Sequence, residues 1–509
     1  MLTPSFGASI ALALPLLSAP APEVPAASQN SDARLERALE TIQTHKLSAD
    51  LHFLASDELA GRDSPSFEQR IAARFLKHRV QRLGLEPGNG ERYLYEYELV
   101  WRALDPAASK LVVEAGNLRL PLSFGNDYYI NDPSGAIEQT LSGPVVYGGL
   151  GTKAELDGLD LEGKWVLVLD EGDGLGEEQS DMERNRLLFS RRNTARRAGA
   201  MGLLVAPRAD YTGVPYSKIL AKTTHRLRQG KVWSPSQAPE SGRAGFTNLY
   251  LSQSAGQALL DTARAGAQLE VGDELSITVT EERRQAGEGE RATLENVCAL
   301  LPGTDPELSR EVIVVSAHYD HVGITGDGEV YNGADDNGSG TTGMLSVAEA
   351  LAEYGGLTRS VLFIWVSAEE KGLLGSQEWC LNPTLPEGYE LVANMNMDMI
   401  GRNAPNELLY TPTEAMGDIH NGMARLLAEL APEEGFTKLK SADEYYHRSD
   451  QINFQRYFDI PVMFVFADIH EDYHQVTDTP DKIDYDKVRR VSRLVVRLLT
   501  ELQDPQLDL

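Results

Sequence analysis

The chain of 509 residues is 42% hydrophobic, which suits a globular protein of about two or three domains, each with a buried core. Its 76 acidic residues against 47 basic ones leave a formal net charge of −29, which excludes the basic surface that nucleic-acid binding requires. Two cysteines, Cys298 and Cys380, cannot form a disulfide framework or an all-thiolate zinc site, so we expect free thiols that pack as small hydrophobic side chains.

Residues 1–30 contain an apolar run from Ala8 to Leu17, followed by alanine, proline and serine. This composition is typical of a secretory signal, although no lysine or arginine precedes the run. The run is too short to cross a bilayer as a helix, which takes about 20 apolar residues, and no later run is longer. We therefore expect a secreted or periplasmic protein with no transmembrane segment beyond this leader.

Residues 31–135 are expected to form the N-terminal part of the main domain. Apolar residues at helical spacing predict helices over 32–45 and 64–85, separated by the polar turn "FLASDELAGRD". Short alternating runs predict strands within 94–133.

Residues 136–285 differ in pattern, because short apolar strands are broken by glycines and accompany one basic helix at 185–200. We expect a separate small α/β domain inserted into the main one. The basic helix is interpreted as a solvated surface that balances an acidic chain.

Residues 286–509 alternate apolar strands with helices. The predicted strands cover 311–320, 359–370, 390–401 and 460–468, and the predicted helices cover 340–355, 371–381 and 484–503. Nearly continuous apolar strands between helices indicate a mostly parallel mixed sheet with helices on both faces. The fold class expected is therefore α/β, with the small domain as an insertion.

Candidate metal ligands and bases follow each of these strands, where ligands bind in such sheets. They are His318 and Asp320, Glu369 and Glu370, Asp398, His474, and the pair Asp335 and Asp336 in the glycine-rich "YNGADDNGSG". Imidazole and carboxylate ligands favour zinc, and two adjacent metals need one bridging carboxylate plus one histidine and one carboxylate each.

The residue count matches such a two-zinc site. His318, Glu370, Asp398 and His474 serve as terminal ligands and one of the paired aspartates as the bridge. Asp320 is placed to orient the imidazole of His318, and Glu369 remains as the general base that activates water.

Five segments, in this order and spacing, resemble the M28 family of di-zinc aminopeptidases over about residues 290–500. They are "SAHYDHVG", "NGADDNGSG", "WVSAEEKGLLGS", "MNMDMIG" and "HEDYHQVTDTP". The resemblance implies two zinc ions held by His318, Asp336 as bridge, Glu370, Asp398 and His474, with Glu369 as base and Asp320 supporting the first histidine. It further implies that Tyr473 helps to stabilise the oxyanion in some members, with a packed aromatic as the alternative. Residues 136–282 resemble the protease-associated (PA) domain of many members, and "SDELAGRD" resembles the opening of bacterial ones.

One departure is Gln451, where the family often has histidine in a Ser-Asp-His sequence; here Ser449, Asp450 and Gln451 stand in its place. No metal ligand is lost, so the change bears on hydrogen bonding around the site and on substrate preference.

These features predict a zinc-dependent exopeptidase, most specifically an aminopeptidase acting on peptides. The open alternatives are a zinc carboxypeptidase or M20-like deacylase, an enzyme like the glutaminyl cyclases, and a non-catalytic ectodomain carrying a PA domain. The spacing of 18 residues from His318 to Asp336 favours M28. Oligomeric state and residue preference are not readable from the sequence.

Overall fold

The computed structural model describes residues 26–102, 104–105, 107–130, 139–170, 190–207, 231–235, 246–263, 268–284 and 290–506. Most of the expected leader, residues 1–25, lies outside these ranges. Within them, no helix combines the length and apolar composition that a bilayer crossing requires.

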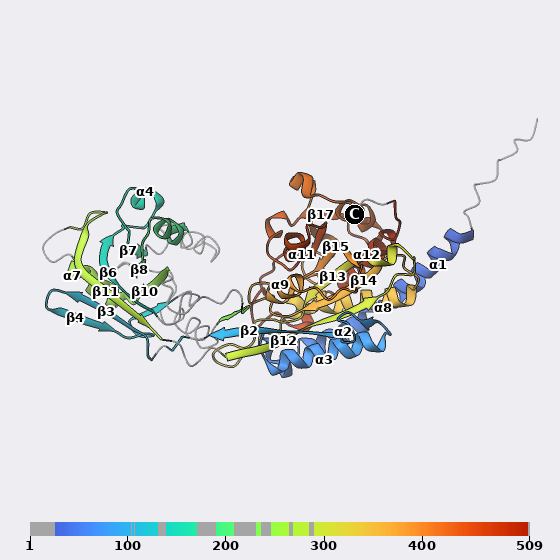
Figure 1. Ribbon diagram of the computed structural model, residues 1–509, viewed down its shortest axis with the longest axis horizontal. Helices are drawn as coiled ribbons and strands as arrows, with labels where there is room; N and C mark the ends of the chain where they lie inside the picture. Colours follow the sequence, from blue (N-terminus) through green and yellow to red (C-terminus); the bar gives the residue numbers. More distant parts are fainter. Residues whose placement is uncertain are drawn as a thin grey trace, which may run out of the picture.

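The larger of two lobes is built on a ten-stranded mixed sheet (Figure 1). In spatial order its strands are β17 (Lys438–Ser441), β16 (Glu407–Thr411), β18 (Val462–Phe466), β15 (Glu390–Met397), β13 (Glu311–His318), β14 (Ser360–Val366), β12 (Glu290–Leu301), β2 (Leu94–Arg102) and β9 (Lys231–Trp233), with β1 (Glu86–Pro87) beside β12. The four central strands, β18, β15, β13 and β14, are parallel, and β12, β2 and β9 follow in antiparallel pairs. The expected α/β fold class is confirmed.

Helices cover both faces of this sheet because its central strands are apolar on both sides. One face packs against α1 (Ala26–Glu40), α2 (Thr44–Leu54), α3 (Phe67–Arg82), α8 (Gly340–Tyr354), α10 (Gly422–Leu430) and α12 (Tyr485–Glu501), and the other against α9 (Leu374–Leu381) and α11 (Gln451–Phe458).

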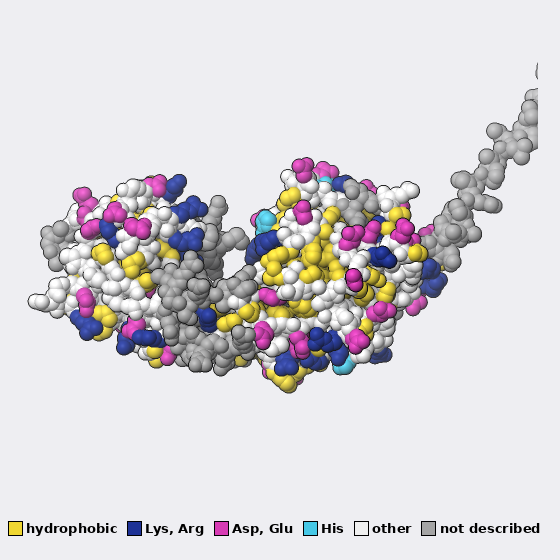
Figure 2. All heavy atoms as spheres, in the orientation of Figure 1, with side chains coloured by type: hydrophobic (Ala, Val, Ile, Leu, Met, Phe, Trp, Pro, Cys, Tyr) yellow, Lys and Arg dark blue, Asp and Glu magenta, His cyan; other side chains and the backbone are white. Residues whose placement is uncertain are grey.

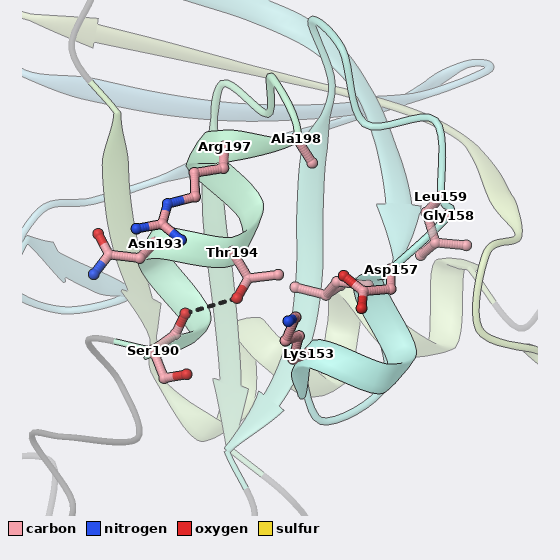
Figure 3. Close-up of a pocket in the computed structure, with 10 residues that line it drawn as sticks. Lys153, Asp157, Gly158, Leu159, Ser190, Asn193, Thr194, Arg197 and Ala198 are labelled. Carbon is pink, nitrogen blue, oxygen red and sulfur yellow. Dashed lines mark hydrogen bonds between the residues drawn. The ribbon is translucent and has the colours of Figure 1, made fainter.

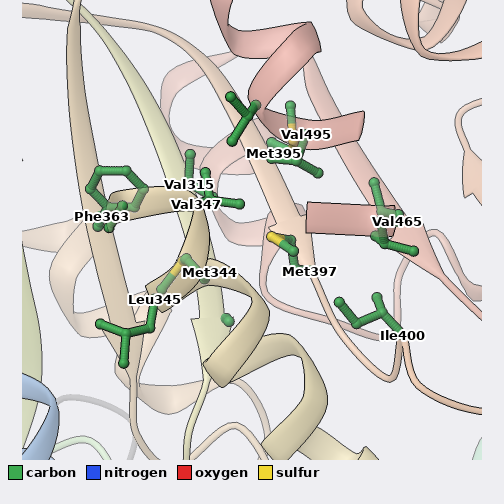
Figure 4. Packing of buried hydrophobic residues seen from close by; sticks show 14 of the residues in the cluster. Val315, Met344, Leu345, Val347, Phe363, Met395, Met397, Ile400, Val465 and Val495 are labelled. Carbon is green, nitrogen blue, oxygen red and sulfur yellow. The ribbon is translucent and has the colours of Figure 1, made fainter. Parts of the chain in front are cut away.

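Alternate residues of each strand enter opposite layers, as the strand period of two requires. Val315 and Phe363 pack against Met344 and Val347 of α8 (Figure 4), whereas Val314 belongs to the layer on the other face. Cys298 and Cys380 are free and buried in that second layer, which confirms their expected role as packed side chains.

The smaller lobe contains an eight-stranded sheet and lies beside the larger one in Figure 1. Its strands, in spatial order, are β4 (Leu118–Leu122), β3 (Lys110–Ala115), β11 (Glu274–Arg283), β6 (Gln139–Tyr147), β7 (Trp165–Asp170), β8 (Gly202–Pro207), β10 (Thr247–Leu251) and β5 (Tyr128–Ile130). Two helices, α4 (Lys153–Leu156) and α7 (Gln253–Ala263), and a helix over 190–197 accompany it.

This second sheet begins earlier in the chain than the expected boundary at residue 136. Strand β4 pairs with β3, β3 pairs with β11, and β5 pairs with β10, so residues 110–130 belong to the inserted lobe and not to the main domain. The pairing is long-range, which local strand patterns do not reveal.

Charged side chains are interspersed on the visible face of both lobes (Figure 2). On this face, acidic and basic side chains lie close to one another in both lobes.

Candidate metal centre

The predicted site residues meet at one edge of the larger sheet, where the parallel strands end. His318 is the last residue of β13, Asp398 follows β15, and Glu369 and Glu370 follow β14. Asp336 lies in the turn Ala334–Ser339, which leads into α8. Parallel neighbours place their carboxyl ends at the same edge, and this is why residues up to about 160 positions apart converge.

Two groups of metal-ligating side chains form here and share Asp336. The first consists of His318, Asp336 and Asp398, and the second of His321, Asp336, Glu370 and His474. All five ligands expected from the sequence are therefore present in the two groups.

His321 is a member that sequence reasoning missed. Its side chain is fully buried, and Nδ1 lies 3.0 Å from Oε1 of Glu370. The signal in the sequence was a third polar residue in the turn after β13, since "HYDH" places a second histidine directly after Asp320.

The spacing between ligand atoms fits bound zinc. Nε2 of His318 lies 3.4 Å from Oδ1 of Asp336 and 3.3 Å from Oδ1 of Asp398. Nε2 of His474 lies 3.0 Å from Oδ2 of Asp336 and 3.2 Å from Oε2 of Glu370. Two ligands of a tetrahedral zinc ion, each about 2.0–2.1 Å from the metal, are about 3.3 Å apart.

Unpaired donor atoms support the same conclusion. Nε2 of His474 and Nε2 of His321 are buried and have no hydrogen-bond partner of acceptable geometry. Among the described residues, no lysine or arginine forms an ion pair with Asp336, Glu370 or Asp398. Buried acids and imidazoles without such partners are costly unless a cation joins them, so the donor set suits zinc.

The carboxylates of the second group are held in the ionised form that a metal requires. Burial raises the pKa of Asp336, but contacts with His318 and His474 outweigh it and hold the pKa well below its usual range. Burial and Asp336 also raise the pKa of Glu370, whereas His321 and His474 lower it to about 2. Burial lowers the pKa of His474, and the same two acids raise it to about 10.

Asp335 and Asp336 have different surroundings although they are adjacent. Each oxygen of Asp336 faces a different histidine, His318 or His474. Asp335 points away from both groups: its Oδ1 accepts the N–H of Gly401 at 2.7 Å, and its Oδ2 lies 3.2 Å from Nε2 of His470. The geometry therefore distinguishes the shared acid from its neighbour.

Glu369 stands next to the two groups without belonging to either. Burial raises the pKa of its carboxyl well above the usual range, His318 lowers it, and Glu370 raises it further. Asp320 accepts the backbone N–H of Glu369 at 3.2 Å. The carboxylate of Asp320 is 3.7 Å from Nδ1 of His318, and the backbone oxygen of Asp320 is 3.2 Å from the same atom. The carboxylate of Asp320 therefore contacts Glu369 more directly than it contacts the imidazole.

Gln451 takes part in a chain of hydrogen bonds that ends on Asp398. Asn396 donates to Oε1 of Gln451 at 3.2 Å and to Oγ of Ser449 at 2.8 Å, and Ser449 donates to Oδ2 of Asp398 at 2.8 Å. Gln451 also donates to the carbonyl of Tyr446 at 2.8 Å. The amide thus has hydrogen-bond partners at both ends, and the orientation of Asp398 does not need a histidine at this position.

A hollow opens beside the metal groups. Its lining includes the metal-site residues His318, Asp336, Glu369 and Asp398, together with Met399, Tyr445, Arg448, Ser449, Phe464, Phe466, Ile469 and Tyr473. The ring of Tyr473 stacks on His474 with centroids 4.0 Å apart, and burial raises the pKa of its hydroxyl. Tyr473 therefore lines the hollow beside His474, and its hydroxyl is protonated at neutral pH.

A second hollow lies in the smaller lobe, between the helix over 190–197 and α4 (Figure 3). Thr194 points toward Lys153 and Asp157, and Asn193 and Arg197 of the same helix also line the hollow. These are ordinary polar surface residues, and both metal-ligating groups of the described residues lie in the larger lobe.

Comparisons with known proteins agree with this geometry. Residues 296–499 match the profile of peptidase family M28. A probable leucine aminopeptidase of Arthroderma otae is 32% identical over 220 residues, covering 41% of this chain and 57% of the relative. Leucine aminopeptidase 1 of Paracoccidioides brasiliensis is 27% identical over 223 residues, covering 41% and 55%. The chain thus spans a little over half the length of these curated relatives.

Two solved structures share the fold over most of the chain. The aminopeptidase from Aneurinibacillus sp. strain AM-1 superposes with a TM-score of 0.58 at 20% identity, covering 91% of this chain and 95% of that one. A zinc aminopeptidase from Bacillus subtilis has a TM-score of 0.54 at 17% identity, with the same coverage. Both lobes are included in these superpositions because 91% of the chain is covered.

Proposed function

Residues 296–499 form a domain of peptidase family M28, and from this premise we propose that the protein is a zinc-dependent aminopeptidase that removes residues from the amino terminus of peptides. The observation that carries the proposal is the pair of ligand groups that share Asp336, with the unligated Glu369 beside them. The names of the relatives support the aminopeptidase specificity.

We assign one zinc ion to each group. His318 and Asp398 would hold one ion, Glu370 and His474 the other, and Asp336 both. Zinc supplies Lewis acidity: it polarises a carbonyl oxygen and lowers the pKa of water to about 7. Nδ1 of His321 faces both acids of the second group, 3.0 Å from Oε1 of Glu370 and 3.8 Å from Oδ2 of Asp336, so His321 would either add a ligand through this atom or keep Glu370 oriented.

Glu369 carries the proton in this mechanism. Its carboxylate takes a proton from the attacking water as the new C–O bond forms at the scissile carbonyl. It then gives that proton to the leaving nitrogen as the C–N bond breaks. Burial raises the pKa of this carboxyl, so it holds the proton taken from water more readily than an exposed carboxyl would. Tyr473 lines the same hollow, and we assign to its hydroxyl the role of donating to the developing oxyanion.

The hollow favours an apolar first residue. Met399, Phe464, Phe466 and Ile469 form its wall, so the side chain of a leucine or phenylalanine would be removed from water there. The leucine aminopeptidases among the relatives are consistent with this preference.

The test is hydrolysis of leucine p-nitroanilide by the full chain. We expect turnover that stops with a chelator and returns with zinc, two zinc ions per chain, and no turnover of the N-acetylated substrate. Glu369→Ala should lower kcat by about 10²-fold to 10⁴-fold with zinc content unchanged. Cleavage of the acetylated substrate would indicate a deacylase or endopeptidase, full activity with one zinc would contradict the two-ion assignment, and activity that survives Glu369→Ala would remove Glu369 as the base.

A further inference from the structure

Residues 61–64, here named the Arg62 segment, lie more than 250 positions before the metal ligands in the chain, yet they contact the turns that carry these ligands. Arg62 is 1% exposed. Its guanidinium donates to the backbone carbonyls of Tyr319 at 2.8 Å, Asn332 at 2.8 Å and Gly333 at 3.0 Å, and to that of Leu54. Tyr319 follows the ligand His318, and Gly333 comes three residues before Asp336, so one side chain joins two ligand-bearing turns.

The next two residues reach the third turn. Oδ1 of Asp63 is 2.5 Å from Nζ of Lys371, and Oγ of Ser64 accepts the backbone N–H of Ala368 at 3.2 Å. Ala368 and Lys371 directly flank Glu369 and Glu370. The Arg62 segment therefore contacts the turns after β13 and β14 and the loop before α8.

The backbone of the segment is strained where it meets these turns. Arg62 has φ = +46° and Ala60, just before the segment, has φ = +44°, a left-handed conformation that is unfavourable for a non-glycine residue. A Cβ atom on Gly61 would lie 2.2 Å from the carbonyl oxygen of Gly323 and 2.5 Å from that of Tyr331. Strain of this kind persists only where the surrounding structure imposes it, and it clusters at functional sites.

The charge of Arg62 also faces the site. Burial lowers its pKa to about 10, whereas Asp320 and Asp336 raise it, so the guanidinium stays protonated at neutral pH. No carboxylate of the described chain forms an ion pair with it, and its hydrogen bonds go to carbonyls. Its positive charge is therefore available to offset the nearby acids.

We propose that Arg62 is a positioning residue of the metal centre: by binding four carbonyl oxygens, its guanidinium holds the turns that carry His318 and Asp336 in ligand geometry. This inference rests on the proposed zinc enzyme. It assigns a role to the "SDELAGRD" motif, which the ligand set and the base leave unexplained.

The test compares Arg62→Met with Arg359→Met in the full chain. Arg359 is a matched control because it is also buried, 4% exposed, and donates to the carbonyls of Leu502 at 2.6 Å and Asp504 at 3.1 Å. It lies at the start of β14, at the opposite end of the strand from the metal groups. Because each substitution leaves buried carbonyls without their donor, both variants should lose thermal stability.

Zinc affinity, measured by dialysis against chelator-buffered zinc, should separate the two variants. We expect Arg62→Met to bind zinc about 10-fold to 100-fold more weakly and the visible spectrum of its cobalt-substituted form to change. Arg359→Met should keep both properties. Arg62→Lys should recover part of the thermal stability but not the affinity, because an ammonium has three donors and cannot span four carbonyls.

Wild-type zinc affinity and cobalt spectrum in Arg62→Met would overturn the proposal, as would an equal loss of affinity in Arg359→Met. If Arg62→Met does not fold, Ser64→Ala decides: weaker zinc binding supports the proposal and unchanged binding refutes it. The wild-type protein separates this inference from the proposed function, because zinc binding without peptidase activity would refute the function and leave the affinity comparison valid.

Discussion

Replacing Asp336 by asparagine should abolish the metal centre, whereas the same change at Asp335 should not. Asp336 directs one oxygen to His318 and the other to His474, at 3.4 Å and 3.0 Å, so it belongs to both ligand groups. A neutral amide replaces an anionic ligand in each group at once. In Asp336→Asn, we expect the zinc affinity of each of the two ligand groups to fall by more than about 100-fold, which corresponds to more than about 2.7 kcal/mol for each zinc ion.

Asp335→Asn changes a residue of the same size at the neighbouring position. The oxygen of asparagine can still accept the N–H of Gly401, which Asp335 accepts at 2.7 Å. Only the charge assistance of that bond and the contact with His470 are lost, so the expected costs are about 1–2 kcal/mol of stability and at most about 10-fold in zinc affinity.

The measurement is zinc per chain after dialysis at a series of buffered zinc concentrations, together with thermal unfolding of each metal-free variant. Asp336→Asn should lose zinc while its metal-free form unfolds near the wild-type temperature, and Asp335→Asn should retain zinc and unfold earlier. Equal losses of zinc in the two variants would refute the assignment of Asp336 as the shared ligand. Retention of two zinc ions by Asp336→Asn would refute the shared site itself.

Three further predictions concern parts of the molecule away from the metal. Burial raises the pKa of the thiols of Cys298 and Cys380. Neither thiol should therefore react with a thiol reagent at pH 8 in the native protein, and both should react in guanidinium. Labelling of the native protein would contradict their burial. Burial lowers the pKa of Lys487 to about 8, below the value of about 10.4 in an unfolded chain, so the native state loses this proton first. The contribution of Lys487 to the free energy of unfolding should therefore rise between pH 8 and pH 10, and guanidinium titrations of Lys487→Met should show a flatter pH dependence than the wild type. Phe363 is 0% exposed in the core, so Phe363→Ala should lower the free energy of unfolding by about 3–5 kcal/mol. Phe67 is 71% exposed, so Phe67→Ala should change it by at most about 0.5 kcal/mol. Similar losses in the two variants would contradict the packing described above.

Convergence of the ligands could be predicted because it follows from topology. Four apolar strands that alternate with helices must be parallel, and their ends must then share an edge, so His318, Glu370 and Asp398 were bound to meet. The role of Asp336 over Asp335 came from the resemblance to the M28 family, and the observed contacts are consistent with it.

His321 and Arg62 could not be found in the same way. His321 reaches Glu370 through the conformation of the turn after β13, and that turn has no periodic pattern. Arg62 donates to a backbone carbonyl 257 positions away. Every residue has such a carbonyl, so the sequence does not show which residue accepts the hydrogen bond. The first strands of the inserted lobe were assigned to the main domain for a related reason, since β3 looks like any short strand until its partner β11 is known.

The sequence by itself therefore determined the periodicities, the fold class of the larger lobe and the residue types at its strand ends, because these depend on local pattern and on the rules of parallel sheets. Only the tertiary structure showed that His321 lies in the second ligand group and that Arg62 contacts the turns that carry the ligands. Those contacts depend on distances of a few ångströms between backbone turns, and such distances are set by packing of the whole domain.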